Sequence, residues 1–363
     1  MGEALTRAAR FPAHAIRVSV VVRSYNRLPA LAELLTALLA QDHDSFEIVV
    51  IEQSTIREPI DVARIDALAR DRRVRIFRHA PLGGPGARNA GVRAARGELL
   101  VFIDDDDLPA STDWIARHEA NFADPNCLGV TGQFADEDGQ AKPYVNVAKA
   151  RRDVLSFNVL KWQRVYARTD VKKRVESLMG GNAAIRRSAL ERFGLWDECT
   201  PIEDEPSLSY RIAAGKGDDE YLLFDPDVKM IRRLDVPGGM AKRTLSGPAY
   251  AKKVFTFLHN VLGHYFPVRF ALLYPIYIYF VGYHVIQWIV SDSKKHVTLP
   301  QRIWAISGFS IVALPLWAWW LVELMGKRVL YGFPEHRPTL APLAIPERIT
   351  VADSAPVHSR ALA

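Results

Sequence analysis

The sequence is poor in cysteine, because Cys127 and Cys199 are the only two among 363 residues. So few thiols exclude the disulfide framework of a small secreted protein, and we expect a reducing, cytoplasmic environment. Residues 1–15 lack the apolar core of a cleavable signal peptide, and we expect them to form an N-terminal extension. The net charge of +6 comes from scattered basic residues without a zinc-finger, helix-turn-helix or aromatic RNA-binding signature, so we expect no nucleic-acid partner.

Strand-like and helix-like segments alternate along the N-terminal part of the chain. Short β-branched runs predict buried strands, and leucines at helical spacing predict amphipathic helices. The expected strands are 16–22, 46–51, 74–77 and 99–103, and the expected helices are 28–39, 60–69 and 87–95, with 83–86 as a loop. This alternation predicts an α/β fold with a doubly wound, mostly parallel sheet. Ser24, Glu52 and Asp104 follow strands, at the carboxyl ends where such sheets bind ligands.

Four consecutive aspartates, Asp104 to Asp107, directly follow the apolar run from Leu99 to Ile103. Neighbouring carboxylates repel one another, and a divalent cation offsets that repulsion because hard oxygen ligands suit Mg²⁺ or Mn²⁺. Such a cation commonly holds substrate phosphates as well, so the run indicates phosphate-bearing chemistry at the end of a strand. The alternative is a solvated acidic turn that closes the strand.

Further motifs accompany the acidic run in a fixed order. They are Val20–Arg27, Glu47–Ser54, Gly86–Gly91, Ala95–Glu98, Asp104–Asp106, Gly180–Asn182, Arg187–Leu190 and Trp196–Glu198. In this order and spacing, roughly the first 240 residues resemble the family 2 glycosyltransferases. The resemblance implies a GT-A (Rossmann-like nucleotide-diphosphosugar transferase) domain over residues 16–250. Arg23 stands where the family often has Pro, which would matter little if its side chain left the crevice, and Glu52 replaces the usual Asp.

The resemblance also implies a nucleotide-sugar donor, carrying UDP, GDP or dTDP, and a divalent metal cofactor, Mg²⁺ or Mn²⁺. Asp106 and Asp104 would hold the metal. The implied donor-binding residues are Ser24, Tyr25, Asn26, Glu52, Arg88, Asp104, Asp105 and Arg233. For Arg88 the alternative is an ordinary surface arginine, because other arginines lie nearby on the same predicted helix.

The family's catalytic carboxylate falls within Glu203-Asp204-Glu205. Matching the Glu-Asp pair puts Asp204 at the base position, whereas counting back from the following Leu and Arg puts Glu205 there. A carboxylate general base removes the proton of the acceptor hydroxyl, and the resulting single displacement inverts the anomeric centre. The alternative is a charged helix start. The implied acceptor-binding residues are Gly181, Asn182, Trp196 and Glu203, although Trp196 could equally belong to the core.

The C-terminal third is apolar and aromatic over 270–290 and again over 303–325. Each segment is long enough to span a bilayer as a helix, but the basic loop between them would then face outward, against the positive-inside tendency. Helices lying in the cytoplasmic interface avoid that conflict, so both arrangements remain open. We expect hydrophobic, membrane-associated helices over 251–332 and a disordered tail over 333–363. The alternative is a buried helical pair, which could form a homo-oligomer interface.

Together these features predict an inverting glycosyltransferase at the cytoplasmic face of the cell membrane. A lipid-linked saccharide of a surface polymer or glycolipid is the expected acceptor, because membrane attachment would bring the enzyme to it. Two other classes stay open: a metal-dependent nucleotidyltransferase of similar fold, and a non-catalytic membrane-bound partner.

Overall fold

The computed structural model describes most of the N-terminal two thirds of the chain. The described residues are 16–135, 171–175, 178–196, 198, 208–209, 211–212, 215–233 and 236, together with 299, 300, 303, 315 and 318. The predicted catalytic cluster Glu203–Glu205, segment 270–290, nearly all of segment 303–325 and both predicted terminal extensions lie outside these residues. Within the described part, no helix combines the length and hydropathy that a membrane crossing requires.

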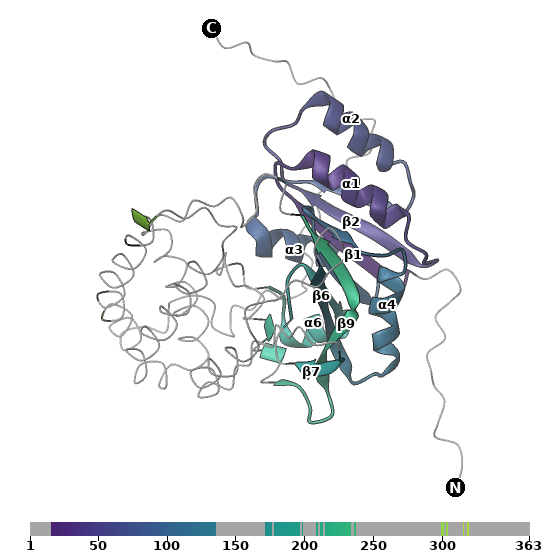
Figure 1. Ribbon diagram of the computed structural model, residues 1–363, viewed down its shortest axis with the longest axis vertical. Helices are drawn as coiled ribbons and strands as arrows, with labels where there is room; N and C mark the ends of the chain where they lie inside the picture. Colours follow the sequence, from purple (N-terminus) through teal and green to yellow (C-terminus); the bar gives the residue numbers. More distant parts are fainter. Residues whose placement is uncertain are drawn as a thin grey trace.

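The first half of the domain follows the predicted βα alternation (Figure 1). Its elements are β1 (Val18–Ser24), α1 (Leu28–Leu39), β2 (Phe46–Glu52), α2 (Pro59–Leu68), β3 (Val74–Arg78), α3 (Gly83–Ala94) and β4 (Leu99–Asp104). The strands pair in parallel in the order β3-β2-β1-β4. The predicted loop 83–86 is wrong, because these residues form the first turn of α3. Pro85 is tolerated there because the first turn of a helix needs no backbone donor from it.

The second half departs from the prediction of a mostly parallel sheet. Its elements are β5 (Asp107–Pro109), α4 (Trp114–Ala120), the 3₁₀ turn η1 (Asn121–Ala123), β6 (Cys127–Ala135), β7 (Lys173–Val175), β8 (Asn182–Arg186), α6 (Arg187–Phe193) and β9 (Tyr221–Arg232). The sheet continues from β4 in the order β8-β6-β9-β5, with β7 also on β9, and only β6–β9 is parallel among these pairs. Parallel neighbours need a long connection, and the long segment of chain between residues 135 and 221 provides one for β6 and β9.

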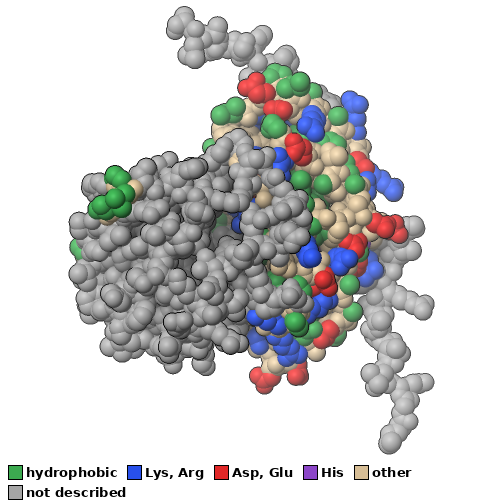
Figure 2. Space-filling view, in the orientation of Figure 1, with side chains coloured by type: hydrophobic (Ala, Val, Ile, Leu, Met, Phe, Trp, Pro, Cys, Tyr) green, Lys and Arg blue, Asp and Glu red, His purple; other side chains and the backbone are tan. Residues whose placement is uncertain are grey.

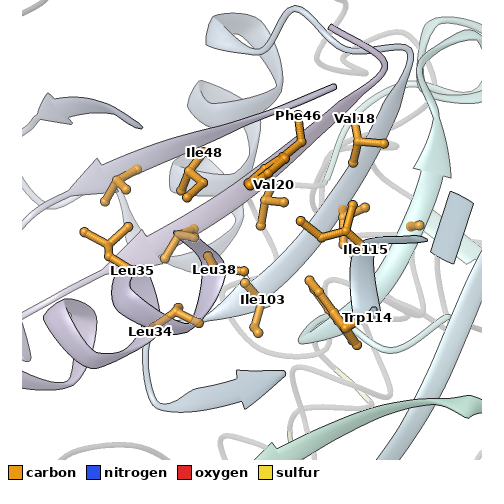
Figure 3. Close-up of a cluster of buried hydrophobic side chains, with 14 of the residues drawn as sticks. Val18, Val20, Leu34, Leu35, Leu38, Phe46, Ile48, Ile103, Trp114 and Ile115 are labelled. Carbon is orange, nitrogen blue, oxygen red and sulfur yellow. The ribbon is translucent and has the colours of Figure 1, made fainter. Parts of the chain in front are cut away.

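Helices cover both faces of the sheet, because both faces of the central strands are apolar. Val20 and Val22 of β1 pack with α1 and α4 in one core, whereas Val21 packs with α3 and α6 in the other. Figure 3 shows the first core, where Leu34, Leu35 and Leu38 of α1 approach the strands and Trp114 of α4 lies beside them. In Figure 2, basic and acidic side chains are interspersed over the described surface, as the scattered charges of the sequence predict.

The strand register places the predicted ligand edge. Ser24 at the end of β1 lies opposite Glu52 at the end of β2, and Arg23 lies opposite Asp104 at the end of β4. The expectation that these residues share one edge of the sheet is therefore confirmed. This edge carries the candidate site.

Candidate active site

The acidic run forms a tight turn between two strands of the sheet. Asp104 ends β4 and Asp107 begins β5, with Asp105 and Asp106 in the turn. Carboxylate oxygens of Asp104, Asp106 and Asp107 all lie within 4.8 Å of one another. Asp105 and Asp107 are only 1% and 2% exposed, so the alternative of a solvated acidic turn is wrong.

Arginines surround the acidic turn. Arg23 binds Asp104 with two hydrogen bonds, from Nε to Oδ1 at 2.7 Å and from Nη2 to Oδ2 at 2.9 Å. The Arg88 guanidinium lies 3.6 Å from Asp104 Oδ1 on the side of α3. The Arg23 side chain therefore turns toward the acidic turn, and the condition under which this residue would matter little is not met.

Two more arginines complete what we call the Asp–Arg cluster, which is Asp104–Asp107 with Arg23, Arg27, Arg88 and Arg232. Arg27 bridges two aspartates, with its Nη2 2.6 Å from Asp105 Oδ1 and its Nη1 donating to Asp106. Arg232, the last residue of β9, lies with its Nε 3.5 Å from Asp107 Oδ1 and packs over the ring of Phe134. Every aspartate of the run therefore has a guanidinium partner.

Burial and charge act on these carboxyls in opposite directions. Burial acts to raise the pKa of Asp104, but the charge of Arg23, the Arg23 hydrogen bonds and the charge of Arg88 together outweigh it and hold this pKa well below its usual range. Burial raises the pKa of Asp105 to about 7, against the opposing charge of Arg27. Burial also raises the pKa of Asp107 well above its ordinary value, although Arg232 opposes the shift. Added positive charge in this turn would stabilise the ionised forms of the buried carboxyls.

The residues present fit a divalent cation. Their oxygens form the hard donor set that Mg²⁺ and Mn²⁺ prefer. Gly181 leaves space beside them, because a Cβ at this position would approach Asp107 Oδ2 to 3.3 Å and Asp104 Oδ2 to 3.4 Å. The sequence prediction named Asp104 and Asp106 as ligands and missed Asp107. The only sequence feature that could have indicated Asp107 is its place as the fourth aspartate of the run, because the position of its side chain depends on the turn into β5.

The predicted donor residues at the end of β2 form their own polar group. Glu52 is 1% exposed, and its Oε2 accepts a hydrogen bond from Arg57 Nε at 3.1 Å and lies 4.0 Å from Arg78 Nε. Its other oxygen accepts from the backbone N–H of Ser54. Ser24 is also buried and lies opposite Glu52 on β1, so both residues lie at this edge of the sheet beneath its surface.

Tyr25 and Asn26 form the turn after β1. The Tyr25 ring is half exposed, and its backbone N–H points to Asp105 Oδ2 at 3.4 Å. Asn26 has a φ of 55°, a left-handed conformation that asparagine tolerates better than most residues. Its Oδ1 accepts from the backbone N–H of Thr55 at 2.8 Å and of Ile56 at 3.2 Å. The Asn26 side chain thus ties this turn to the loop after β2, and Tyr25 is the residue that remains accessible.

The two predicted donor-binding arginines lie at the cluster but differ in orientation. Arg88 is 2% exposed, so the alternative of an ordinary surface arginine is wrong. The Arg233 side chain is paired with Glu33 of α1, and its backbone N–H donates to the Asp106 carbonyl at 3.3 Å. The neighbouring Arg232, which the sequence prediction did not select, contacts the acidic turn with its side chain instead.

The predicted acceptor residues occupy three different environments. Gly181 lies beside the acidic turn, as described above. Trp196 is 2% exposed and packs edge-on against Phe102, with ring centroids 4.4 Å apart. Burial leaves no ring face of Trp196 for a sugar, so the core alternative holds for this residue.

Asn182 is fully buried and forms what we call the Asn182 hub. Its Oδ1 accepts from Trp114 Nε1 at 3.2 Å and from His118 Nε2 at 3.1 Å. Its Nδ2 donates to the backbone carbonyls of Gln133 at 3.2 Å and Val228 at 3.1 Å. These bonds use both ends of the amide. Asn182 therefore joins α4, β6, β8 and β9, and its side chain is not available to an acceptor.

Comparisons with known proteins agree with this architecture. The glycosyl transferase family 2 model matches residues 19–194. The chain is 33% identical over 129 residues to the uncharacterized glycosyltransferase EpsJ of Bacillus subtilis (strain 168), covering 35% of this chain and 37% of that relative. It is 27% identical over 143 residues to the poly(ribitol-phosphate) beta-glucosyltransferase of Bacillus spizizenii, covering 38% of this chain and 22% of that relative. The matched region thus spans well under half of either relative.

A solved structure is similar over nearly the whole chain. The mannosyltransferase PcManGT from Pyrobaculum calidifontis, solved in complex with GDP-Man and Mn²⁺, has a TM-score of 0.50 and 17% identity, covering 87% of this chain and 89% of that chain. At this identity the likeness concerns the fold alone. With the strand order and the acidic turn described above, residues 19–194 match the glycosyl transferase family 2 model, and the described sheet is a GT-A-like mixed α/β sheet.

Proposed function

We propose that the protein transfers a sugar from a nucleoside-diphosphate sugar to a hydroxyl of its acceptor, with inversion at the anomeric centre. One observation carries the proposal: a buried acidic turn with arginine partners lies at the carboxyl ends of the strands, beside Ser24 and Glu52. Glu52 and Ser24 would bind the nucleoside, with Tyr25 at the accessible rim. Arg23, Arg27 and Arg88 would bind the diphosphate, which guanidinium groups recognise well.

Asp104, Asp106 and Asp107 would hold Mg²⁺ or Mn²⁺. A divalent cation bound there supplies positive charge that stabilises the departing diphosphate. The Mn²⁺ and GDP-Man in the PcManGT structure support this assignment by analogy of fold. The nearby guanidiniums act on the same developing charge, because they are already oriented toward the acidic turn.

The acceptor proton would pass to a carboxylate of the Glu203–Glu205 segment. We assign Asp204 as this general base and Glu205 as the alternative, while Glu203 would contact the acceptor. A positioned base is typically worth ~10²–10⁴ in rate. Gly181 lies beside the acidic turn, where a side chain would approach Asp104 and Asp107 and crowd a sugar bound there.

A lipid-linked saccharide at the cytoplasmic face of the membrane is the proposed acceptor. The apolar segments 270–290 and 303–325 support membrane contact, whether they cross the bilayer or lie in its interface. The poly(ribitol-phosphate) beta-glucosyltransferase, whose name indicates a polymer acceptor, supports a role in surface-polymer synthesis. A homo-oligomer formed through the same segments belongs to this proposal.

A product assay on the full chain tests the transfer. Purified protein with native lipid extract is given UDP-, GDP- and dTDP-sugars with Mn²⁺ or Mg²⁺, and nucleoside diphosphate release is measured. We expect release from one donor class, and loss of release with EDTA. Release of diphosphate from nucleoside triphosphates would instead identify a nucleotidyltransferase. Absence of nucleoside diphosphate release from every donor would favour a non-catalytic partner.

The same assay assigns the base. Asp204→Ala is expected to lower the rate by about 10²–10⁴ with an unchanged metal requirement. Loss in Glu205→Ala with activity kept in Asp204→Ala would move the base to Glu205.

A further inference from the structure

With all four aspartates ionised, the Asp–Arg cluster is balanced in formal charge. Four aspartates face four arginines, and each carboxylate has a guanidinium within ion-pair distance. A divalent cation that enters alone leaves this buried turn with excess positive charge, and a dianionic diphosphate alone leaves it with excess negative charge. The two together keep the balance. Uncompensated charge is costly in a poorly solvated site, so the two ligands favour each other's binding.

Arg23 holds the position on which this coupling depends. Its guanidinium engages both carboxylate oxygens of Asp104, at 2.7 and 2.9 Å, which is the fork geometry of a strong arginine–carboxylate pair. Asp104 is also one of the three aspartates whose oxygens converge as metal ligands. The guanidinium and a cation at Asp104 therefore compete for the same oxygens and repel each other.

The surroundings of Arg23 allow its guanidinium a second position, away from Asp104 and near the first turn of α3. The Arg23 side chain is 31% exposed, whereas Arg88 is 2% exposed and Arg27 is tied to two carboxylates. Arg23 also lies against the first turn of α3, since a Cβ on Gly84 would clash with Arg23 Nη1. The start of a helix is positively polarised and favours a phosphate group. A guanidinium released from Asp104 would thus remain next to the place where a diphosphate is favoured.

We propose that Arg23 is a built-in counter-ion of Asp104 that passes from this carboxylate to the donor diphosphate when a divalent cation binds. Arg23 is then a positioning residue that makes metal and donor binding interdependent. It weakens binding of the metal alone and strengthens binding of the metal with the nucleotide. This inference rests on the proposed function, because it requires a nucleoside-diphosphate donor at the Asp–Arg cluster.

Calorimetric titration of the full chain with Mn²⁺, alone and with saturating UDP or GDP, tests the proposal. For Arg23→Gln we expect Mn²⁺ alone to bind about tenfold more tightly than to the wild type, because the competing charge is gone. We also expect the factor by which the nucleotide improves Mn²⁺ affinity to fall about tenfold, and the reciprocal titration to give the same factor. Arg23→Lys, which keeps the charge without the fork, should lie between the two.

Arg73→Gln is the matched control. Arg73 binds Asp71 with the same two-bond geometry, at 3.1 and 2.9 Å, on the loop before β3. We expect its loss to leave Mn²⁺ affinity and its coupling to nucleotide unchanged. An equal effect of both substitutions would overturn the proposal, because it would reflect net charge rather than the Asp104 contact.

A melting measurement separates the proposal from simple misfolding. Arg23→Gln removes the hydrogen-bonded counter-ion of Asp104 and leaves Arg88 beside it at 3.6 Å. The melting temperature of this variant without metal should therefore fall, and Mn²⁺ should raise it by more than it raises that of the wild type. Unchanged or weaker Mn²⁺ binding to a folded Arg23→Gln protein overturns the role of Arg23 alone. Wild-type protein that binds Mn²⁺ neither with nor without any nucleotide overturns the proposed function and this inference together.

Discussion

Two polar groups in this domain, the Asp–Arg cluster and the Asn182 hub, differ in charge, in burial and in whether their polar atoms are accessible to a ligand. The cluster carries full charges at a sheet edge, and Asp104 and Arg23 retain access to solvent. The hub is neutral and fully buried, with the Asn182 amide committed to Trp114, His118 and two backbone carbonyls. A satisfied buried network rigidifies a fold, whereas charges held at an accessible edge are available to a ligand. Residues predicted as binding groups therefore fall into a charged set at the accessible sheet edge and a buried set that supports the architecture.

Asp106→Asn makes the sharpest test of this division. We expect nucleoside diphosphate release to fall by about 10²–10³. The substitution removes a proposed carboxylate ligand of the cation that stabilises the negative charge of the departing diphosphate. The free energy of unfolding should change by less than about 1 kcal/mol, since Asp106 is partly exposed. Asp113→Asn is the control, because Asp113 pairs with Arg117 on an exposed helix turn. Equal activity in the two variants would remove the acidic turn from catalysis.

Asn182→Ala should give the opposite pattern. It leaves the Trp114 and His118 donors and two backbone carbonyls without their partner in a buried site. We expect about 2–4 kcal/mol less unfolding free energy in urea, with metal affinity unchanged in the folded protein. Exposed Asn126→Ala should lie within about 0.5 kcal/mol of the wild type. A stable Asn182→Ala protein with a raised KM for the acceptor would instead support the predicted acceptor-binding role of Asn182.

His118 gives the hub a pH dependence of its own. Burial lowers the pKa of His118 to about 4, although its hydrogen bond to Asn182 opposes the shift. Between about pH 6.5 and pH 4, His118 is therefore protonated in the unfolded chain but neutral in the folded protein. The free energy of unfolding falls as the pH drops through this range. At pH 5 this loss amounts to about 2 kcal/mol relative to pH 7.5. Urea unfolding of His118→Gln at both pH values should show that much less pH dependence, and an identical pH dependence would contradict a neutral buried imidazole.

Trp196→Phe should have the smallest effect. The ring keeps its edge contact with Phe102 but loses volume, so we expect a cost of about 1–1.5 kcal/mol in unfolding free energy. The KM values for donor and acceptor should stay within twofold. A large rise in the acceptor KM without a stability change would show that Trp196 stacks on a sugar after all.

The parallel half of the sheet was predictable because its signals are local. Period-specific apolar runs specify β1 to β4 and the helices between them, and strand ends in a parallel sheet must share an edge. The second half was not, because β5, β8 and β9 pair across long sequence separations that no local pattern encodes. The choice of Asp107 over Asp105 as the third converging oxygen depends on the turn between β4 and β5.

By itself, the sequence determined the α/β alternation, the edge that carries the site and the acidic run with its chemistry, since each depends on residue type and short spacing. The tertiary structure alone decided which polar side chains face a ligand. Trp196 and Asn182 are buried by neighbours far along the chain, whereas Arg23, Arg27 and Arg232 meet the acidic turn from β1, the turn after it and β9. Burial and charge partnership depend on three-dimensional neighbours, so the sequence shows which residue types are present but not which of them stay accessible or which partners they have.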